Sequence, residues 1–261
     1  MSIKIGIAGI GAIGSALARA LTSEEGIGQY KLDCISDPDA KSNFNVPNVD
    51  FDTLMTRCDL TVECLPTAVV PELATAAFKS NTDIIFISAA ALLLYPQIMD
   101  NHKTSESRIY IPSGALCGLD GVRAMRELGI KSAKIASTKP PLGFNGAPFI
   151  IENNISLSDI KDKTLLFEGN ALEASKGFPA NVNVAATLSL AGIGAKNTRV
   201  EIWADPMAKS NMHEITISSK YSTLTSRIEN MPDPMNPKSS ILAAQSIVST
   251  LRNMNNSIIM T

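Results

Sequence analysis

Three features of the 261-residue sequence predict an α/β fold built from two domains. Short apolar runs alternate with segments of helical periodicity as far as Pro112, which is typical of an open parallel sheet. A turn with three glycines follows the first apolar run. The pattern changes after Ser113, which predicts that an α+β domain is inserted into the first domain.

The composition excludes several classes of protein. Hydrophobic residues make up 45% of the chain and charged residues 18%, which excludes a disordered or fibrous protein. The 23 basic and 25 acidic residues nearly balance, and Lys and Arg occur mostly singly, so no nucleic-acid partner is expected. The longest apolar run, residues 84–95, is shorter than the ~20 residues that span a bilayer, so no membrane partner is expected.

The cysteines and histidines indicate neither a metal site nor a disulfide framework. The four cysteines show no paired spacing typical of metal ligands, and the chain has two histidines. We therefore expect no bound metal. Reduced thiols fit a cytoplasmic protein.

The first elements of the chain form a strand, a glycine turn and a helix. Residues 3–8 are expected to be a buried strand and residues 15–21 an alanine-rich helix. A second strand, residues 31–36, ends at Asp37, which lies 23 residues beyond Gly14, close to the ~20 expected for an acid that binds a ribose. This order predicts a Rossmann-type dinucleotide-binding domain.

Each glycine of the turn has a separate expected task. Gly9 permits a tight turn, Gly11 lets the backbone approach a pyrophosphate, and Gly14 lets the helix pack closely on the strand. The phosphates would bind the positive N-terminus of the helix. The residues expected to contact them from this turn are Gly9, Gly11, Ala12, Ile13 and Gly14.

Asp37 indicates the preferred cofactor. A carboxylate at this position repels the 2′-phosphate of NADP, so NAD is favoured. Lys41 lies close to Asp37 in the sequence, so NADP remains an alternative cofactor.

The remaining part of the first domain continues the alternation. Strands are expected at residues 60–64, 83–88 and 108–112, with helices at 70–79 and 94–103. Ligands on such sheets bind beyond the carboxyl ends of the strands. The residues singled out at these ends are Leu65, Pro66, Ser88 and Ala89 for the cofactor, and Ser113 and Gly114 beside the nicotinamide.

The second domain is expected to contain helices at 119–128 and 183–191 and strands at 131–138, 200–203, 212–218 and 221–228. A helix at 237–252, with Pro237 in its first turn, is expected to return to the first domain. The predicted boundaries are residues 1–114 plus 232–261 for the dinucleotide-binding domain and 115–231 for the catalytic and dimerisation domain.

Histidine is the natural group to manage a proton at neutral pH. His102 stands in a polar helix end and is expected on the solvated surface. His213 begins a predicted strand after a turn-rich loop and is the better candidate.

Candidate donors for the substrate carboxylates come from both predicted domains. Lys139 follows a strand, and Asn211 lies two residues before His213. A solvated lysine and a turn-forming asparagine explain these two residues equally well. Ser113 and Gly114 offer a hydroxyl and a close backbone N–H.

Several longer stretches resemble the L-aspartate dehydrogenase family, in order and over nearly the whole chain. They are residues 111–120 (Ile-Pro-Ser-Gly-Ala-Leu-Cys-Gly-Leu-Asp), 167–169 (Phe-Glu-Gly), 178–192 (Phe-Pro-Ala-Asn-Val-Asn-Val-Ala-Ala-Thr-Leu-Ser-Leu-Ala-Gly), 204–206 (Ala-Asp-Pro), 211–213 (Asn-Met-His), 229–230 (Glu-Asn) and 236–238 (Asn-Pro-Lys). These motifs are far more specific than the glycine turn.

The resemblance implies a cytoplasmic homodimer that oxidises L-aspartate to iminosuccinate with NAD or NADP. It implies a place in NAD biosynthesis or, in reverse, in ammonia fixation. His213 matches the catalytic histidine of the family, and Ala115 and Asn183 match its cofactor contacts. One departure is that relatives often carry Ser-x-Gly-Ala where this chain has Ser88-Ala89-Ala90-Ala91, which puts close backbone approach there in doubt.

The sequence also allows other functional interpretations. Cys117 follows a strand, as the acyl-forming nucleophile of an aldehyde or semialdehyde dehydrogenase would. A dihydrodipicolinate reductase-like or homoserine dehydrogenase-like enzyme shares the two-domain plan. A regulator that has lost catalysis would keep the glycine turn and Asp37 without needing residues 181–213.

Overall fold

A computed structural model describes residues 2–39, 44–233 and 236–259, and these fall into two compact units. The first unit contains the chain up to Gly114 and again from Leu242, and the second runs from Ala115 to Ile241. The predicted boundary assigned residues 232–241 to the first domain, whereas this segment clusters with the second unit. The mixed α/β class predicted from the sequence is confirmed.

The sheet of the first unit is parallel. Its order is β2-β1-β3-β4-β5, and its strands are β1 (Ile3–Ala8), β2 (Tyr30–Ser36), β3 (Leu60–Glu63), β4 (Asp83–Phe86) and β5 (Ile109–Tyr110). The strand order reverses between β1 and β3. A crevice for ligands forms at such a point, outside the carboxyl ends of the strands.

The helices of the first unit are α1 (Ala12–Thr22), α2 (Phe51–Arg57), α3 (Val70–Lys79), α4 (Ala90–Leu94), α5 (Gln97–His102) and α10 (Ile241–Asn255). The helix predicted at 94–103 corresponds to α5, which begins only at Gln97 after its N-cap Pro96. Helix α4, which ends at Leu94, was not predicted. Helix α2 was not predicted. It is short, and its N-terminus is capped by Asp50, whose carboxylate accepts the Thr53 N–H at 2.7 Å.

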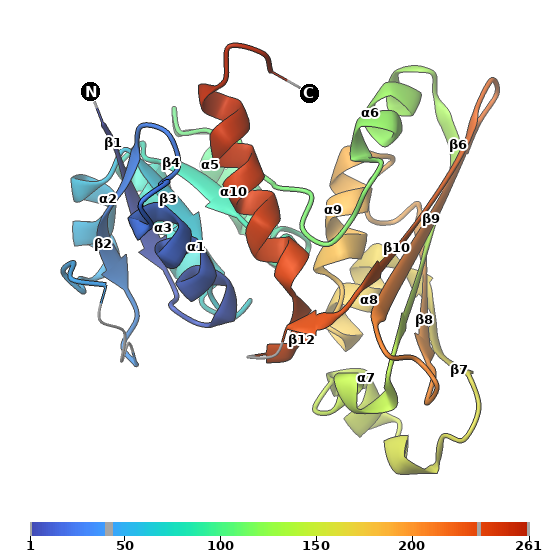
Figure 1. Ribbon diagram of the computed structural model, residues 1–261. Coiled ribbons are helices and arrows are strands. Elements are labelled where there is room, and N and C mark those ends of the chain that lie inside the picture. The colour runs from blue at the N-terminus through green and yellow to red at the C-terminus, as the bar shows by residue number, and fades with distance from the viewer. Residues whose placement is uncertain (1, 40–43, 234–235, 260–261) are drawn as a thin grey trace. The chain divides into compact units, whose positions relative to one another are not determined.

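The C-terminal helix α10 completes the core of the first unit (Figure 1). Ile247 and Leu251 of α10 are fully buried in the same cluster as Ile5, Ile7 and Leu17. Burial of each such side chain contributes about 1.5–3 kcal/mol. The return of the C-terminal segment to the first unit therefore has a clear energetic basis.

The start predicted for this helix was wrong. Pro237 lies in strand β12 (Asn236–Ser240), which pairs with β11 (Pro232–Asp233) in a small antiparallel sheet. The helix begins only at Ile241. A proline near the start of an apolar periodic segment fits a first helical turn and a short strand equally well.

The second unit contains a mixed sheet in the order β10-β9-β6-β8-β7. Within the described residues of this sheet, only the β6–β8 pair is parallel. The strands are β6 (Ile130–Lys139), β7 (Thr164–Asn170), β8 (Thr198–Ala204), β9 (Asn211–Ser219) and β10 (Thr223–Asn230). Buried residues alternate with more exposed ones along β8 and most of β9, because successive side chains point to opposite faces.

Three helices of the second unit lie on one face of this sheet (Figure 1): α6 (Leu119–Glu127), α8 (Ala171–Gly177) and α9 (Asn183–Ala191). Strand β7 and helix α8 were not predicted, although Asn170 and Glu173 form a capping box at the start of α8. Shorter helical turns follow β6, namely η1 (Pro141–Phe144), α7 (Pro148–Glu152) and η2 (Leu157–Asp159).

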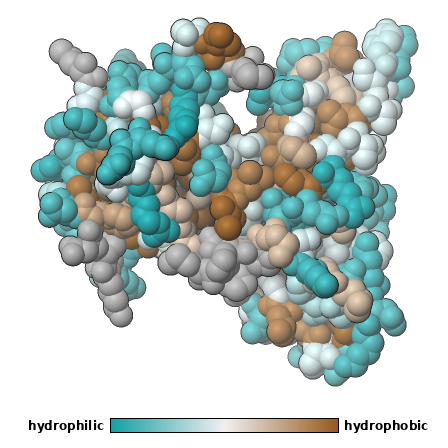
Figure 2. Space-filling model, in the orientation of Figure 1, coloured by the Kyte–Doolittle hydropathy of each residue, from teal (hydrophilic) through white to brown (hydrophobic). Residues whose placement is uncertain are grey.

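Part of the segment after β6 is apolar at the surface. Leu142 and Ile151 are 75% and 65% exposed, and Figure 2 shows apolar surface in the region of α7. Single exposed apolar residues are common on globular proteins.

No helix among the described residues is both long enough and apolar enough to cross a bilayer.

Candidate functional site

Two glycines of the turn after β1 are required by the fold, and the third faces open space. A Cβ at Gly9, whose φ is +89°, would lie 2.4 Å from the Cys64 carbonyl oxygen. A Cβ at Gly14 would lie 1.9 Å from the Gly9 carbonyl oxygen. By contrast, a Cβ at Gly11 would have no atom within 4 Å. The space at Gly11 is therefore free for a ligand.

Helix α1 begins at this open space. Gly11 is its N-cap and supplies no capping side chain, so the first amides of the helix are not satisfied by a cap. Ala12 and Ile13 follow as the first residues of the helix. Free amides and the positive end of the helix dipole form an anion site that fits a pyrophosphate.

Asp37 lies beside the glycine turn, directly after β2. Its Oδ2 accepts the Ile10 N–H at 2.6 Å, and its Oδ1 accepts the Asp39 N–H at 2.9 Å. The strand end and the turn are thus held together at the carboxyl edge of the sheet. Lys41 lies outside the described residues.

Glu63, a residue that the sequence analysis missed, holds the next two strand ends together. It is fully buried at the end of β3, where its two oxygens accept the Leu65 N–H at 2.6 Å and the Ser88 N–H at 2.9 Å. The Ser88 hydroxyl in turn donates to the Leu65 carbonyl at 3.1 Å. Burial raises the pKa of Glu63 to about 7, although these hydrogen bonds oppose the shift. The sequence feature that could have identified Glu63 is a carboxylate at the end of an otherwise uncharged buried strand.

The other candidates in the first unit lie on loops at this edge. Pro66 is exposed, whereas Ala89 is buried and serves as the N-cap of α4. Gly114 has a φ of +63°, and its N–H donates to Ser246 Oγ of α10 at 3.1 Å. Ser113 is half-buried. Ala90 and Ala91 of the run that follows Ser88 are buried in α4.

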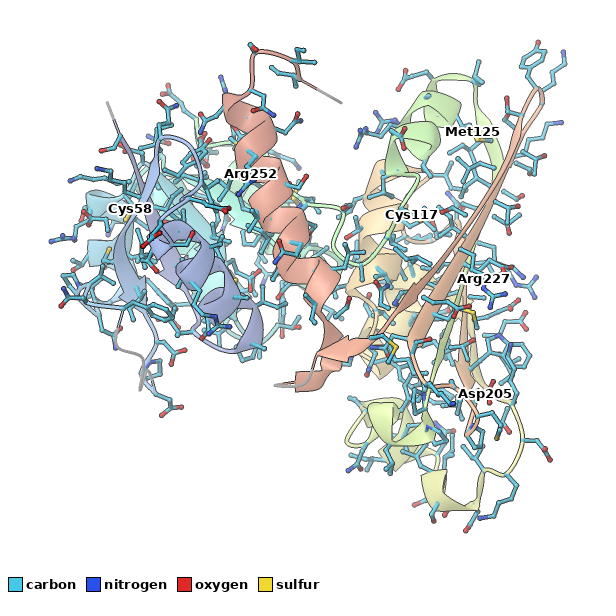
Figure 3. The ribbon with its side chains drawn as sticks, viewed as in Figure 1. Cys58, Cys117, Met125, Asp205, Arg227 and Arg252 are labelled. Atoms are coloured by element: carbon cyan, nitrogen blue, oxygen red, sulfur yellow. The ribbon has the colours of Figure 1, made fainter. Side chains whose placement is uncertain are left out.

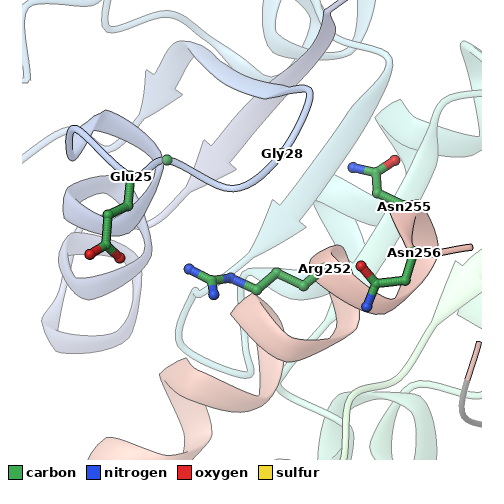
Figure 4. Close-up of a pocket in the computed structure, with 6 residues that line it drawn as sticks. Glu25, Gly28, Arg252, Asn255 and Asn256 are labelled. Carbon is green, nitrogen blue, oxygen red and sulfur yellow. The ribbon is translucent and has the colours of Figure 1, made fainter. Parts of the chain in front are cut away.

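A separate pocket of about 470 Å³ lies at the other end of α1 and is lined by Glu25, Gly26, Gly28, Arg252, Asn255 and Asn256. Figure 4 shows Arg252 extending from α10 toward the loop that carries Glu25. Because ligands of parallel sheets bind at the carboxyl edge, this pocket does not correspond to the dinucleotide site.

In the second unit, three predicted residues and Ser137 lie on two neighbouring strands. Ser137 and Lys139 are on β6, and Asn211 and His213 are on β9. Ser137 is directly opposite His213 in the antiparallel register. Because residues two apart share a face, all four side chains belong to the same face of the sheet, and each residue is at most 5% exposed.

His213 is held by Ser137. The Ser137 Oγ lies 2.9 Å from Nδ1 of His213, which leaves Nε2 as the other ring nitrogen. Burial and the nearby charge of Lys139 lower the pKa of His213 to about 3. The imidazole is therefore neutral over the physiological range. Sequence analysis did not single out Ser137, because its importance depends on a partner on another strand.

Lys139 is a buried cation. It is 5% exposed, and burial lowers its pKa to about 8. Within the described part of the chain, no carboxylate forms an ion pair with it. A buried ammonium without a counter-ion is costly, so this position fits an anionic ligand.

Further polar residues are tied to the same end of the sheet. Asn230, which pairs with Asn211 across β9 and β10, donates through Nδ2 to the Ala115 carbonyl at 3.2 Å. Asn183 begins α9, and Asn181, two residues earlier, donates to the Gly143 carbonyl at 3.0 Å in the turn after Lys139.

Two other sequence interpretations can be compared with the structure. His102 was expected on the solvated surface, but it is half-buried: its Nε2 lies 2.6 Å from the Ser107 carbonyl oxygen, and its ring packs against Phe78. Cys117 lies before α6 (Figure 3), and its Sγ is 2.7 Å from Ser226 Oγ. A serine hydroxyl is not the base that a nucleophilic thiol requires.

The chain is similar to known dehydrogenases over nearly its whole length. The family model described as aspartate dehydrogenase, C-terminal, matches residues 120–254, and the model described as homoserine dehydrogenase, NAD binding domain, matches residues 9–112. L-aspartate dehydrogenase 3 of Bordetella bronchiseptica is 40% identical over 260 residues, covering 97% of this chain and 95% of that protein. L-aspartate dehydrogenase of Methanococcoides burtonii is 41% identical over 262 residues, covering 96% of each.

Solved structures show a similar fold. The crystal structure of aspartate dehydrogenase from Thermotoga maritima has a TM-score of 0.80 and 30% sequence identity, with both chains covered completely. A hyperthermophilic archaeal homoserine dehydrogenase in complex with NADPH has a TM-score of 0.58 at 13% identity, covering 96% of this chain and 97% of that one. The latter likeness concerns the fold alone.

Proposed function

The chain belongs to the L-aspartate dehydrogenase family, and from that premise we propose that it oxidises L-aspartate to iminosuccinate with NAD or NADP and catalyses the reverse reductive amination. It is an NAD(P)-dependent oxidoreductase that acts on the CH–NH₂ group of aspartate. The observation that carries the proposed chemistry is the buried group of Ser137, Lys139 and His213. The related two-domain reductases and a silent regulator are not favoured by these comparisons.

The cofactor is assigned to the carboxyl edge of the first sheet. The open space at Gly11 and the first amides of α1 fit its pyrophosphate. Leu65, Pro66, Ser88 and Ala89 would border it, and Ala115 and Asn183 are proposed as further contacts. When bound, the cofactor supplies the acceptor for the α-hydrogen of aspartate.

Asp37 supports a preference for NAD. Its carboxylate is held beside the glycine turn by the Ile10 N–H. In this position it can accept hydrogen bonds from a ribose hydroxyl and would repel a 2′-phosphate. We expect Asp37→Ser to raise the KM for NAD and lower the KM for NADP. Equal effects on both cofactors would contradict the assignment.

His213 is proposed as the acceptor of the amine proton. Aspartate must lose a proton from its ammonium group before the nitrogen lone pair can form the imine. If Nδ1–H donates to Ser137 Oγ, Nε2 carries the lone pair and can take that proton. A dicarboxylate bound nearby raises the pKa of His213, because its negative charge stabilises the imidazolium.

Lys139 is proposed to bind a substrate carboxylate. Its buried ammonium has no ion-pair partner among the described residues, and a charge-assisted hydrogen bond at such a site is worth about 1.5–3 kcal/mol. Asn211 is two residues from His213 on β9 and is proposed to orient the amino acid. Ser113 and Gly114 are proposed as further donors.

The proposal extends to assembly and cellular role. We propose a cytoplasmic homodimer that supplies iminosuccinate to NAD biosynthesis. On the face of the second sheet opposite Ser137 and His213, Trp203 and Met212 are half-buried in the single chain. Sedimentation velocity at micromolar protein concentration tests the dimer, and a single monomeric species would contradict it.

The activity is tested by adding L-aspartate with NAD or NADP at alkaline pH and following the absorbance of the reduced cofactor. His213→Ala should lose most of kcat, whereas His102→Ala is the matched control for the other histidine and should retain it. Cofactor binding without turnover in the wild type would instead favour a regulator. A His213→Ala enzyme with wild-type kcat would refute the role of the histidine.

A further inference from the structure

Two thiols lie side by side in the core of the first unit, away from the carboxyl edge of the sheet. Cys34 is on β2 and Cys58 directly follows α2, so they come from segments 24 residues apart. Their sulfur atoms are 3.4 Å apart, and the residues are 0% and 7% exposed. Figure 3 shows Cys58 within this unit.

The neighbouring strand leaves room for this pair. Gly6 of β1 is directly opposite Cys34 in the sheet register. A Cβ at Gly6 would lie 3.0 Å from the Cys58 Sγ and 2.9 Å from Leu54 Cδ1. Because Gly6 has no side chain, the Cys58 thiol can pack against the sheet beside Cys34.

The hydrogen bonds at the pair favour ionisation of Cys34 over that of Cys58. Arg57 forms an ion pair with Asp33, with Nε 2.9 Å from Oδ2. Hydrogen bonds from the Cys58 thiol and the Arg57 guanidinium lower the pKa of Cys34, although burial and Asp33 oppose this. The same hydrogen bond and burial raise the pKa of Cys58. Of the two thiols, Cys34 is therefore the one whose ionisation is favoured.

A metal ion fits this cluster less well. Asp33, Cys34 and Cys58 place one ligand atom each within 4.8 Å of one another. However, the Asp33 carboxylate already faces two cations, Arg57 and, at 3.8 Å, the Nζ of Lys4. These positive charges repel a metal ion and stabilise a thiolate.

We propose that Cys34 and Cys58 are a redox-active pair that closes an intramolecular disulfide when the protein meets a peroxide. The Cys34 thiolate attacks one oxygen of hydrogen peroxide, the O–O bond breaks, and a sulfenic acid forms while the leaving hydroxide takes up a proton and departs as water. Cys58 then attacks the Cys34 sulfur, the S–O bond breaks, and a second water leaves. The two thiols lose two electrons and two protons, and one peroxide is reduced to two waters.

Access to the pair requires only a local opening. Helix α2 has seven residues, and Cys58 lies at its end. Helices of this length are stable only through their packing, so the end of α2 is expected to open more readily than the sheet. Oxidation should therefore proceed in the folded protein, but more slowly than at a fully exposed thiol.

The disulfide would tie β2 to the end of α2. Cys34 lies three residues before Asp37, whose carboxylate accepts the Ile10 N–H of the glycine turn. The cross-link restricts the unfolded chain between residues 34 and 58, so the oxidised protein should melt at a higher temperature than the reduced protein. Dithiothreitol should reverse the change.

The test uses the purified full-length chain treated with hydrogen peroxide under native conditions. Remaining thiols are then alkylated in denaturant, and peptides are mapped by mass spectrometry. We expect a peptide pair joined through Cys34 and Cys58, a loss of two hydrogens from the intact mass, and alkylated Cys64 and Cys117. Cys34→Ala and Cys58→Ala should each abolish the joined peptides, and Cys117→Ala is the matched control that should retain them.

Two outcomes would overturn the proposal. In the first, Cys34 and Cys58 both remain alkylatable after Cys117 has been oxidised by the peroxide. In the second, the purified wild type contains a stoichiometric metal ion that both Cys34→Ala and Cys58→Ala remove. The cysteine variants are first checked for wild-type circular dichroism, and wild-type mapping by itself decides the question if either variant fails to fold.

Discussion

Ser137 and His213 face each other across the antiparallel strands β6 and β9, with Ser137 Oγ 2.9 Å from His213 Nδ1. The two residues are 76 positions apart in the sequence. A hydrogen bond at one ring nitrogen determines which nitrogen can exchange a proton with a substrate. Ser137 is therefore a positioning residue for His213.

Ser137→Ala should lower kcat by roughly tenfold, because a hydrogen bond of about 1–1.5 kcal/mol that fixes the imidazole is lost. The KM for NAD should change little, since Ser137 lies in the second unit. Ser137→Thr keeps the hydroxyl and should recover part of the activity. Steady-state kinetics over a range of pH checks this, and an unchanged kcat in Ser137→Ala would contradict the positioning role.

Lys139→Met should weaken binding of dicarboxylates by roughly 10- to 100-fold, since a charge-assisted bond is lost. The pKa of Lys139 is lowered to about 8, so the ammonium is charged below that pH and neutral above it. Inhibition by succinate, whose carboxylates stay ionised in this range, should therefore weaken as the pH rises through about 8 in the wild type.

The control for this prediction is Lys134→Met, on the same strand. Lys134 is half-buried on the other face of the sheet, where it pairs with Glu201 at 3.3 Å. This variant should keep the wild-type inhibition constant and its dependence on pH. If Lys139→Met retains the same pH dependence, another group binds the carboxylate.

Glu63→Gln should change how the melting temperature depends on pH. The folded protein raises the pKa of Glu63 from 4.5 to about 7, so its contribution to stability is complete below pH 4.5 and is lost as the pH rises through 7. The loss is on the order of 3 kcal/mol. The melting temperature of the wild type should therefore fall relative to that of Glu63→Gln over this interval.

Glu72→Gln, which changes an exposed carboxylate on α3, is the matched control for calorimetry. Its melting curve should remain parallel to that of the wild type over the whole interval. A parallel curve for Glu63→Gln as well would mean that Glu63 does not titrate there.

Gly11→Ala and Gly14→Ala should separate ligand binding from folding. A methyl group at Gly11 enters space that is open in the protein, so the melting temperature should be nearly unchanged while the KM for NAD rises tenfold or more, on the order of 1.4 kcal/mol. At Gly14 the methyl group would lie 1.9 Å from a carbonyl oxygen, so the melting temperature itself should fall. Equal effects of both variants on melting would contradict the assignment of Gly11.

Local chemistry carried much of the prediction for the first unit. A strand and a glycine turn can be predicted from residues that are close in the sequence. This holds for residues 3–8, for the three glycines and for Asp37. The same reasoning failed for α2, β7 and α8, which are short and whose burial depends on what packs against them. It also extended the last helix to Pro237, because nothing local distinguishes a first helical turn there from a strand.

The sequence alone predicted a two-domain α/β fold and the glycine turn followed by Asp37. It also favoured His213 over His102 as the catalytic candidate. Only the folded chain decided which side chains meet: Ser137 with His213, Glu63 with Leu65 and Ser88, and Cys34 with Cys58. The physical reason is that local patterns specify backbone conformation, whereas such pairs depend on strand order and register, which are set by burial over the whole sheet.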